Sequence, residues 1–245
     1  EKMIGKTDLN GFDVDESTQY LSVYRPEKII ENEKLPVIVW IHGGSYEIGC
    51  GDLATADPTD WVKEQNVIIV SVSYRLGIFG FLGGSEERPA NLGLFDIIEA
   101  LKWIKKYISE FGGDSENITL FGQSSGGDAI AHIMISEDVE DLFKKLIIHS
   151  APLGLRKNRQ KMSAELLKNT EMYSSETDAL EIVENYKNHF PSFFKYGLKA
   201  AMPFGTQYGF PPLCAENEAE EKWKQSARKY DVLIGINDEE TAFYL

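Results

Sequence analysis

The sequence Gly122-Gln123-Ser124-Ser125-Gly126-Gly127 is the stretch that indicates the fold most directly. It follows the apolar run 118–121 and precedes a helix-forming stretch at 129–135, so a G-x-S-x-G motif lies between a predicted strand and a predicted helix. Small residues on both sides of Ser124 allow a tight turn that would project the serine hydroxyl above the edge of a sheet. The pattern predicts a nucleophilic serine, although an ordinary glycine-rich turn would have the same composition.

A second glycine-rich segment, His42-Gly43-Gly44-Ser45, directly follows the apolar run 36–41. Serine esterases use a loop of this kind, whose main-chain N–H groups hold the negatively charged oxygen of the reaction intermediate. The N–H of Ser125, the residue after the nucleophile, would supply a further donor. Losing one such donor typically slows the reaction by about 10²–10³-fold. We therefore predict an oxyanion hole formed by Gly43, Gly44, Ser45 and Ser125.

These two segments belong to a longer series of matches, through which the chain resembles the type-B carboxylesterase/cholinesterase family of α/β-hydrolases. Six stretches fit the family's landmarks in order and at similar spacing: 15–24, 39–44, 73–82, 91–96, 100–104 and 111–114. The resemblance is dense from about residue 15 to residue 150 and returns at 231–245. It implies the α/β-hydrolase fold, with a mostly parallel sheet, helices on both faces and a cap insertion. It also implies carboxylic ester hydrolysis through an acyl-enzyme.

The hydrophobic pattern along the chain is typical of such a fold, because short apolar runs alternate with amphipathic stretches. Strands are expected at 19–25, 37–41, 67–74, 118–121, 145–149 and 231–235. Helices are expected at 59–64, 91–111, 126–136, 162–169, 179–186 and 216–230. We predict a single partial domain over residues 1–245, with a core of 1–152 and 213–245. The remaining part, 153–212, is polar and dotted with aromatic residues, and it is predicted to form a cap-like insertion.

The resemblance further implies a Ser-His-Glu triad. The stretch 237–241 resembles the family's K-D-E-G-S segment, so Glu239 corresponds to the acid of the triad. Asp238 is its nearest competitor, and a solvated charge cluster is the simpler interpretation. Along the chain the triad of this fold runs serine, acid, histidine, yet no histidine follows Glu239. We therefore expect an incomplete piece of a larger hydrolase, whose triad histidine lies in a completing C-terminal segment.

The four histidines of the chain are weak candidates for the missing base. His42 belongs to the predicted oxyanion loop, and His189 falls in a variable helical stretch. His132 would lie roughly 12 Å along a helix from Ser124, beyond the hydrogen-bond reach of about 3 Å. His149 ends an apolar run, and the carboxyl ends of strands border the site in an open α/β sheet. It stays as a minor alternative.

Several residues depart from the family's pattern, among them Ser45, Ser125 and Glu240. Ser45 stands where a third glycine is usual, and its side chain would narrow the acyl site. Ser125 replaces a common alanine, and Glu240 replaces a glycine. These departures leave open a second hypothesis, a non-catalytic member of the same fold with an adhesion or scaffold role. The presence of Ser124 favours the hydrolase.

Composition limits the classes of partner. The net charge of −14, from 39 acidic and 25 basic residues, argues against nucleic acid and anionic membrane surfaces. The two cysteines, Cys50 and Cys214, do not suggest a disulfide framework. Without a recognisable secretory or membrane-spanning run, the sequence predicts a cytoplasmic enzyme. Its expected partner is a small-molecule ester, and no metal or organic cofactor is implied.

Overall fold

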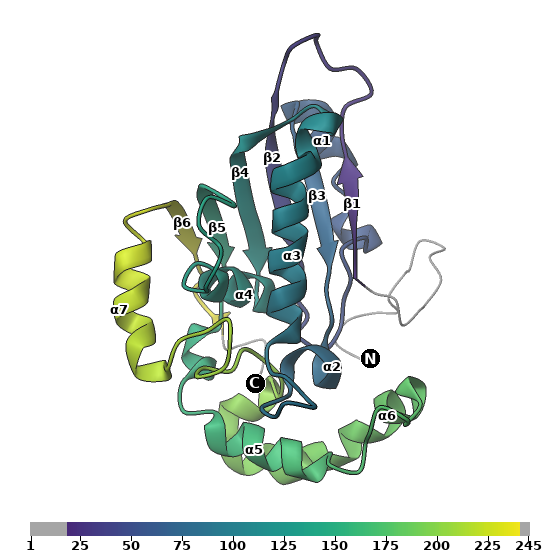
Figure 1. The fold of residues 1–245 in the computed structure, drawn as a ribbon, viewed down its shortest axis with the longest axis vertical. Helices are drawn as coiled ribbons and strands as arrows, with labels where there is room; N and C mark the ends of the chain where they lie inside the picture. Colours follow the sequence, from purple (N-terminus) through teal and green to yellow (C-terminus); the bar gives the residue numbers. More distant parts are fainter. Residues whose placement is uncertain (1–18, 241–245) are drawn as a thin grey trace.

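The computed structural model describes residues 19–240, and within them six strands form one mixed sheet (Figure 1). These are β1 (Tyr20–Tyr24), β2 (Leu35–Ile41), β3 (Ile68–Ser73), β4 (Gly113–Gln123), β5 (Lys145–His149) and β6 (Asp231–Gly235). The order across the sheet is β1-β3-β2-β4-β5-β6. Only β1 is antiparallel to its neighbour. All six lie close to their predicted bounds except β4, which starts early because Gly113 pairs with Leu35.

The helices follow the predicted positions with four additions, one α-helix and three 3₁₀ segments. The α-helices are α1 (Thr59–Gln65), α2 (Gly77–Phe81), α3 (Leu92–Tyr107), α4 (Ser125–Ile133), α5 (Gln160–Asn169), α6 (Ala179–Asn185) and α7 (Glu216–Ser226). The 3₁₀ segments are η1 (Ala54–Ala56), η2 (Ile108–Phe111), η3 (Leu153–Arg156) and η4 (Tyr186–Ala201), the last interrupted by a kink at Gly197. The sequence did not predict α2, η1, η3 or η4. Two glycines in the five residues of α2 hide its helical character.

One face of the sheet carries the main core. Helices α3 and α4 cover this face (Figure 1), and the residues of β2 that point into it are fully buried: Leu35, Val37, Val39 and Ile41. On the opposite face, Trp40 and Phe121 are only half-buried. Helix α1 reaches this second face, where the ring of Trp61 stacks on Phe121 with centroids 5.8 Å apart. Helices therefore lie on both faces, but the second face is covered less completely.

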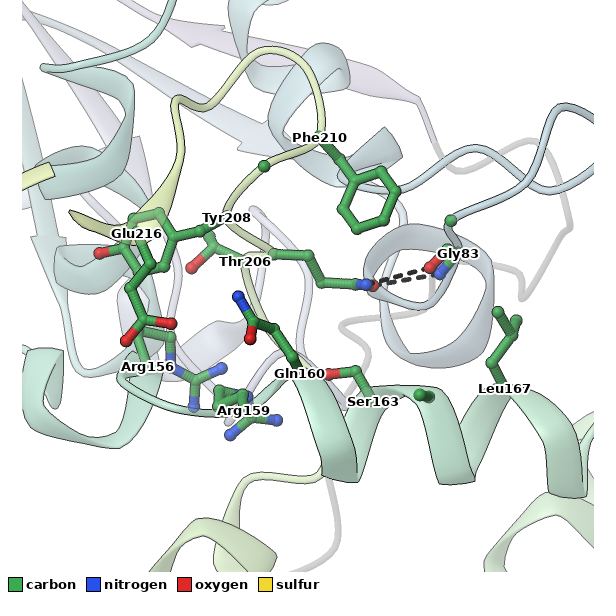
Figure 2. Close-up of a pocket in the computed structure, with 14 residues that line it drawn as sticks. Gly83, Arg156, Arg159, Gln160, Ser163, Leu167, Thr206, Tyr208, Phe210 and Glu216 are labelled. Carbon is green, nitrogen blue, oxygen red and sulfur yellow. Dashed lines mark hydrogen bonds between the residues drawn. The ribbon is translucent and has the colours of Figure 1, made fainter. Parts of the chain in front are cut away.

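The predicted cap-like insertion leaves the sheet after β5. Its elements η3, α5, α6 and η4 lie beyond the carboxyl ends of the parallel strands (Figure 1). The loop that follows is fastened to the core by Gln207, whose side-chain amide forms two hydrogen bonds, of 3.1 and 3.0 Å, with the main chain of Gly83 (Figure 2). Helix α7 then returns beside α4, where Trp223 donates to the carbonyl oxygen of Ala131 at 2.7 Å. The insertion therefore lies at the edge of the sheet that carries the G-x-S-x-G turn.

Two expectations concern the chain as a whole. Cys50 and Cys214 are free thiols, as the sequence predicted. Between residues 19 and 240, none of the helices combines the length and the apolar character needed to cross a bilayer.

An ion pair between Arg75 and Asp96 links the loop after β3 to α3. The Asp96 carboxylate accepts hydrogen bonds from the Arg75 main-chain N–H, Nε and Nη2 at 3.0, 2.8 and 2.7 Å. Its side chain is only 7% exposed. We expect Asp96→Asn to lower the free energy of unfolding by about 2 kcal/mol, because the charged acceptor of the three hydrogen bonds from Arg75 is lost.

The matched control is Glu99→Gln on the same helix. Glu99 is 69% exposed and pairs with Lys102, so its loss should leave stability nearly unchanged. Urea denaturation of both variants measures the difference. Equal losses of stability would contradict the structural role given to Asp96.

Candidate active site

Ser124 lies at a sharp turn between the end of β4 and the start of α4. Its backbone angles are φ 56° and ψ −126°, a combination that residues other than glycine rarely adopt. Its N–H donates to the carbonyl oxygen of His149 at 2.9 Å, and its own carbonyl oxygen accepts from the N–H of Asp128 at 2.9 Å. The turn is therefore strained and held from both sides. Such a turn presents a serine in the way that the G-x-S-x-G motif predicts.

The glycines of the motif are required by close contacts between main chains. A Cβ on Gly126 would lie 2.1 Å from the carbonyl oxygen of Ile41 and 2.6 Å from that of His42. A Cβ on Gly122 would lie 2.6 Å from the carbonyl carbon of Gly126. The absence of side chains at these positions lets the first turn of α4 pack directly on the end of β2.

We expect Gly126→Ala to lower the free energy of unfolding by about 3 kcal/mol or more, because two main-chain segments must move to admit the methyl group. Gly154→Ala is the matched control, since no atom lies within 4 Å of its Cβ position. That variant should be as stable as the parent or slightly more stable. Urea denaturation compares the two, and similar losses of stability would show that the tight packing of α4 on β2 is wrong.

The loop after β2 lies against this turn. A Cβ on Gly43 would lie 3.3 Å from the Cβ of Ser124 and 2.7 Å from the carbonyl oxygen of Gln123. The next residues, Gly44, Ser45 and Tyr46, all have positive φ angles, of 114°, 58° and 61°. Position 45 is therefore one where glycine is favoured, and a serine there carries a backbone cost of about 1–2 kcal/mol.

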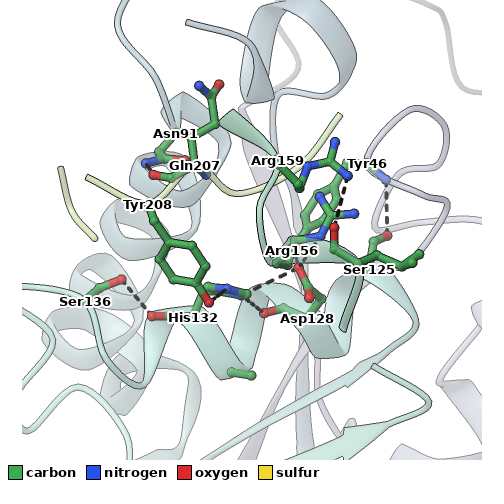
Figure 3. Close-up of polar contacts among 12 residues, drawn as sticks. Tyr46, Asn91, Ser125, Asp128, His132, Ser136, Arg156, Arg159, Gln207 and Tyr208 are labelled. Atoms are coloured by element: carbon green, nitrogen blue, oxygen red, sulfur yellow. Dashed lines mark hydrogen bonds and ion pairs between the residues drawn. The ribbon is translucent and has the colours of Figure 1, made fainter. Parts of the chain in front are cut away.

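Tyr46 joins this loop to α4 at two points (Figure 3). Its main-chain N–H donates to the Oγ of Ser125 at 3.2 Å, and its hydroxyl donates to the Oδ2 of Asp128 at 2.6 Å. Ser125 is the first residue of α4, so its own N–H has no acceptor within the helix. The structure thus brings Gly43 close to Ser124 and has Ser125 directly after it, with Gly44 and Ser45 in the same loop as Gly43. Their assignment as an oxyanion hole stays a prediction.

Nothing in the local sequence marks Tyr46 or Asp128 as part of the site. The only available signal is the charge of Asp128 at the start of an otherwise apolar helix. Its side chain is fully buried. Besides the hydroxyl of Tyr46, the carboxylate faces the positive charge of Arg156, whose Nε lies 3.8 Å from Oδ2. A buried charge of this kind is stable only when other groups compensate it. Residues far apart in the sequence supply that compensation here.

His42 has a structural role in the loop. Its Nδ1 lies 2.8 Å from the carbonyl oxygen of Gly43, and its ring stacks on Tyr74 with centroids 4.4 Å apart. The hydroxyl of Tyr74 donates to the carbonyl oxygen of His42 at 2.6 Å. Burial lowers the pKa of His42 to about 4. The imidazole is therefore neutral at pH 7, and Nδ1 carries the hydrogen that it donates to Gly43.

The ring of His132 also has a structural role, because both of its nitrogens contact other groups. Its Nδ1 lies 2.7 Å from the carbonyl oxygen of Asp128, and its Nε2 lies 2.8 Å from the hydroxyl of Tyr208. Burial lowers its pKa, so the neutral ring is favoured. Both ring nitrogens therefore have partners other than Ser124.

The main chain of His149 holds the turn, because its carbonyl oxygen accepts from the N–H of Ser124. Its ring packs edge-on against Phe121, with centroids 5.3 Å apart, and a Cβ on Gly235 would lie 3.4 Å from its Cδ2. No hydrogen bond joins the ring of His42, His132 or His149 to the hydroxyl of Ser124. The side chain of His189 lies outside the described part of the structure.

Glu239 follows β6 at the same edge of the sheet as Ser124. The last residues of β4, β5 and β6 are in register, through the pairs Gln123–His149 and His149–Gly235. Two strand spacings therefore separate the turn from the end of β6, about 10 Å. Glu239 is exposed.

Its neighbour Glu240 is held in the turn after β6. The Oε1 of Glu240 accepts from the N–H of Asn237 at 2.7 Å. This hydrogen bond, with a smaller contribution from Ser150, lowers the pKa of Glu240. Glu240 thus stabilises the turn, whereas Glu239 stays available at its surface.

Comparison with known proteins identifies the family of the chain. Residues 2–245 match the family described as "Carboxylesterase family". The chain is 34% identical over 218 residues to a "Probable N-octanoylanthranilate hydrolase" of Rhodococcus erythropolis, which covers 86% of this chain and 48% of the relative. It is 43% identical over 138 residues to the para-nitrobenzyl esterase of Bacillus subtilis, over 55% of this chain and 28% of the relative.

Solved structures give the same result. A thermophilic PNB esterase aligns with a TM-score of 0.77 and 29% identity over 92% of this chain and 48% of that one. A second PNB esterase aligns with a TM-score of 0.74 and 30% identity. The chain thus spans about half the length of these solved relatives. Taken with the strained serine turn and its neighbouring glycine loop, these matches show that the chain has the α/β-hydrolase fold and belongs to the carboxylesterase family.

Proposed function

We propose that the protein hydrolyses carboxylic esters with Ser124 as the nucleophile. The observation that carries the proposal is the strained turn at Ser124, with the main chain of Gly43 packed beside it. Ser124 Oγ attacks the ester carbonyl carbon, and the N–H groups of the loop and of Ser125 hold the oxygen as it becomes negative. The alcohol leaves, and an acyl group stays on Ser124 until water releases it as the acid.

The reaction also needs a base, because a serine hydroxyl is a weak nucleophile until its proton is removed. We infer that a histidine in a completing C-terminal segment takes this proton and passes it to the leaving alcohol, with Glu239 orienting the ring. The distance of about 10 Å between Ser124 and the end of β6 supports a bridging histidine. In a triad the serine and the acid each contact the histidine and need not contact each other.

The edge of the described sheet supports such a completing segment. Within residues 19–240, β6 is an edge strand, yet Leu233 and Ile234 on its two faces are 59% and 64% exposed, and Ile236 after it is 77% exposed. Apolar residues on both faces are typical of strands inside a parallel sheet. The half-length coverage of the relatives agrees with this interpretation.

The names of two relatives guide the choice of substrate. One is called a probable N-octanoylanthranilate hydrolase and another a para-nitrobenzyl esterase. Both names refer to small organic molecules, and we infer a small-molecule ester for this protein. The mechanism uses side chains and main-chain groups alone.

A p-nitrophenyl acetate assay of the protein with its completing segment tests the proposal. We expect steady release of p-nitrophenol after a burst equal to the enzyme concentration, because the acyl-enzyme forms before it is hydrolysed. Turnover no faster than in buffer would instead favour the non-catalytic member of the fold.

A further inference from the structure

The loop after β2 has an unfavourable backbone conformation. The φ angles of Gly44, Ser45 and Tyr46 are 114°, 58° and 61°. For residues with a side chain such angles are costly, and they persist only where surrounding groups hold them. The N–H groups of this loop are the ones assigned to the proposed oxyanion hole. The loop therefore needs a contact that keeps it in this shape.

Tyr46 supplies that contact (Figure 3). The residue is 0% exposed, and its ring packs on Phe81 with centroids 4.2 Å apart. Its carbonyl oxygen accepts from the N–H of Gly77 at 2.6 Å, while its N–H and its hydroxyl donate to the side chains of Ser125 and Asp128. Every polar group of Tyr46 is thus bonded, and two of the three hydrogen bonds lead to α4, the helix that follows the serine turn.

Asp128 is a buried charge that the proposed mechanism does not use. Its side chain is 0% exposed, and Oδ2 lies 3.6 Å from the Nδ1 of His132 and 3.8 Å from the Nε of Arg156. Its Oδ1 has no hydrogen-bond partner in the described part of the chain. Because burial favours the neutral form of His132 by lowering its pKa, Arg156 is the positive charge beside the carboxylate.

Stability is a weak explanation for a carboxylate at this position. Replacing a buried ion pair by apolar residues of similar volume is often neutral or stabilising. What a carboxylate does provide is a strong and directional acceptor, because hydrogen bonds to charged groups are shorter and stronger than those between neutral groups. The 2.6 Å bond from the hydroxyl of Tyr46 is of this kind. Asp128 therefore holds Tyr46 more firmly than a neutral acceptor would.

We propose that Asp128 and Tyr46 are positioning residues for the oxyanion hole. Asp128 holds the hydroxyl of Tyr46, and Tyr46 in turn holds the N–H groups of Gly44 and Ser45 in place relative to that of Ser125. Ser125 and Asp128 lie three residues apart on α4, less than one helical turn, so the donor and the anchor move together. This role rests on the proposed function, since it gives the loop a part in ester hydrolysis.

Tyr46→Phe removes the hydroxyl and keeps the ring. In the protein with its completing segment, we expect kcat for p-nitrophenyl acetate to fall about 10–100-fold, because the loop donors are less well placed. Acylation and deacylation both pass through an oxyanion, so both should slow and KM should change less than threefold. The affinity for a trifluoromethyl ketone, whose adduct with the serine carries an oxyanion, should fall by the same factor as kcat/KM.

A double-mutant cycle tests whether the two residues act together. Asp128→Asn keeps the shape of the side chain, removes its charge and should lower kcat in the same way. The double variant should be no slower than the slower single variant, because both changes weaken one hydrogen bond. Losses that multiply in the double variant would show independent effects and overturn the proposed coupling. If Tyr46→Phe does not fold, a parental kcat for folded Asp128→Asn would overturn the proposal.

Tyr24→Phe is the matched control. The hydroxyl of Tyr24, on the edge strand β1, donates to the Oδ1 of Asp52 at 2.6 Å, so the same kind of bond is removed away from the serine turn. Its kcat and its affinity for the ketone should equal those of the parent. If Tyr46→Phe behaves like Tyr24→Phe and changes only the melting temperature, the bond between Tyr46 and Asp128 is merely structural.

The parent protein separates this inference from the proposed function. An active parent whose folded Tyr46→Phe variant keeps its kcat would contradict the positioning role alone. An inactive parent that also fails to bind the trifluoromethyl ketone would overturn both, because there would be no oxyanion for the loop to hold.

Discussion

Ser124→Ala is expected to lower the kcat for p-nitrophenyl acetate by about 10⁶-fold in the protein with its completing segment. In the proposed mechanism the hydroxyl is the attacking group, and the strained turn holds the Cβ of Ser124 beside Gly43. Alanine keeps the backbone and removes only the oxygen, so folding should be little affected. Steady-state kinetics with a thermal melting curve on the same sample separate the loss of chemistry from a loss of structure.

Ser136→Ala is the matched control. Ser136 follows α4, and its hydroxyl donates to the carbonyl oxygen of His132 at 3.0 Å. Its loss should leave kcat within a few-fold of the parent. A Ser124→Ala variant that folds and still turns over at the parental rate would assign the nucleophile to another residue.

Glu239→Gln is expected to lower kcat by about 10⁴-fold, close to the effect of neutralising the acid in other serine triads. In the proposed triad, a carboxylate at this position orients the histidine and stabilises its protonated form. The amide does neither well. Because Glu239 is exposed in the described structure, the free energy of unfolding should change little, and kcat is the quantity that reports its role.

Two neighbouring variants make this test specific. Glu240→Gln retains an acceptor for the N–H of Asn237 and should reduce kcat less than tenfold. Asp238→Asn should behave in the same way. If Asp238→Asn or Glu240→Gln shows the large loss and Glu239→Gln does not, the acid has been assigned to the wrong carboxylate.

The sequence predicts the central sheet well because its strands are short apolar runs bounded by turns. It predicts the serine turn because a G-x-S-x-G motif needs only neighbouring residues. It does not predict α2, in which Gly77 and Gly80 lower helix propensity, nor η4, whose 3₁₀ turns are interrupted by a kink at Gly197. Only packing on the rest of the chain specifies these elements.

The buried network behind the site also escapes sequence reasoning. Tyr46, Asp128 and Arg156 lie on a loop, on a helix and on a 3₁₀ segment, and only the folded chain brings them together. The ring of Tyr46 lies 5.7 Å from the guanidinium of Arg156. Periodicity and motif spacing carry no information on contacts of this kind. A charged residue in an apolar segment is the one feature of the sequence that indicates a buried partner.

The central claim is that Ser124 is a nucleophile activated by its surroundings. The most direct test is to treat the protein, with its completing segment, with a fluorophosphonate and to locate the adduct by peptide mass spectrometry. The claim predicts one phosphonylated residue, Ser124, with no labelling of the Ser124→Ala variant. An unlabelled protein, or an adduct on a different serine, would contradict it.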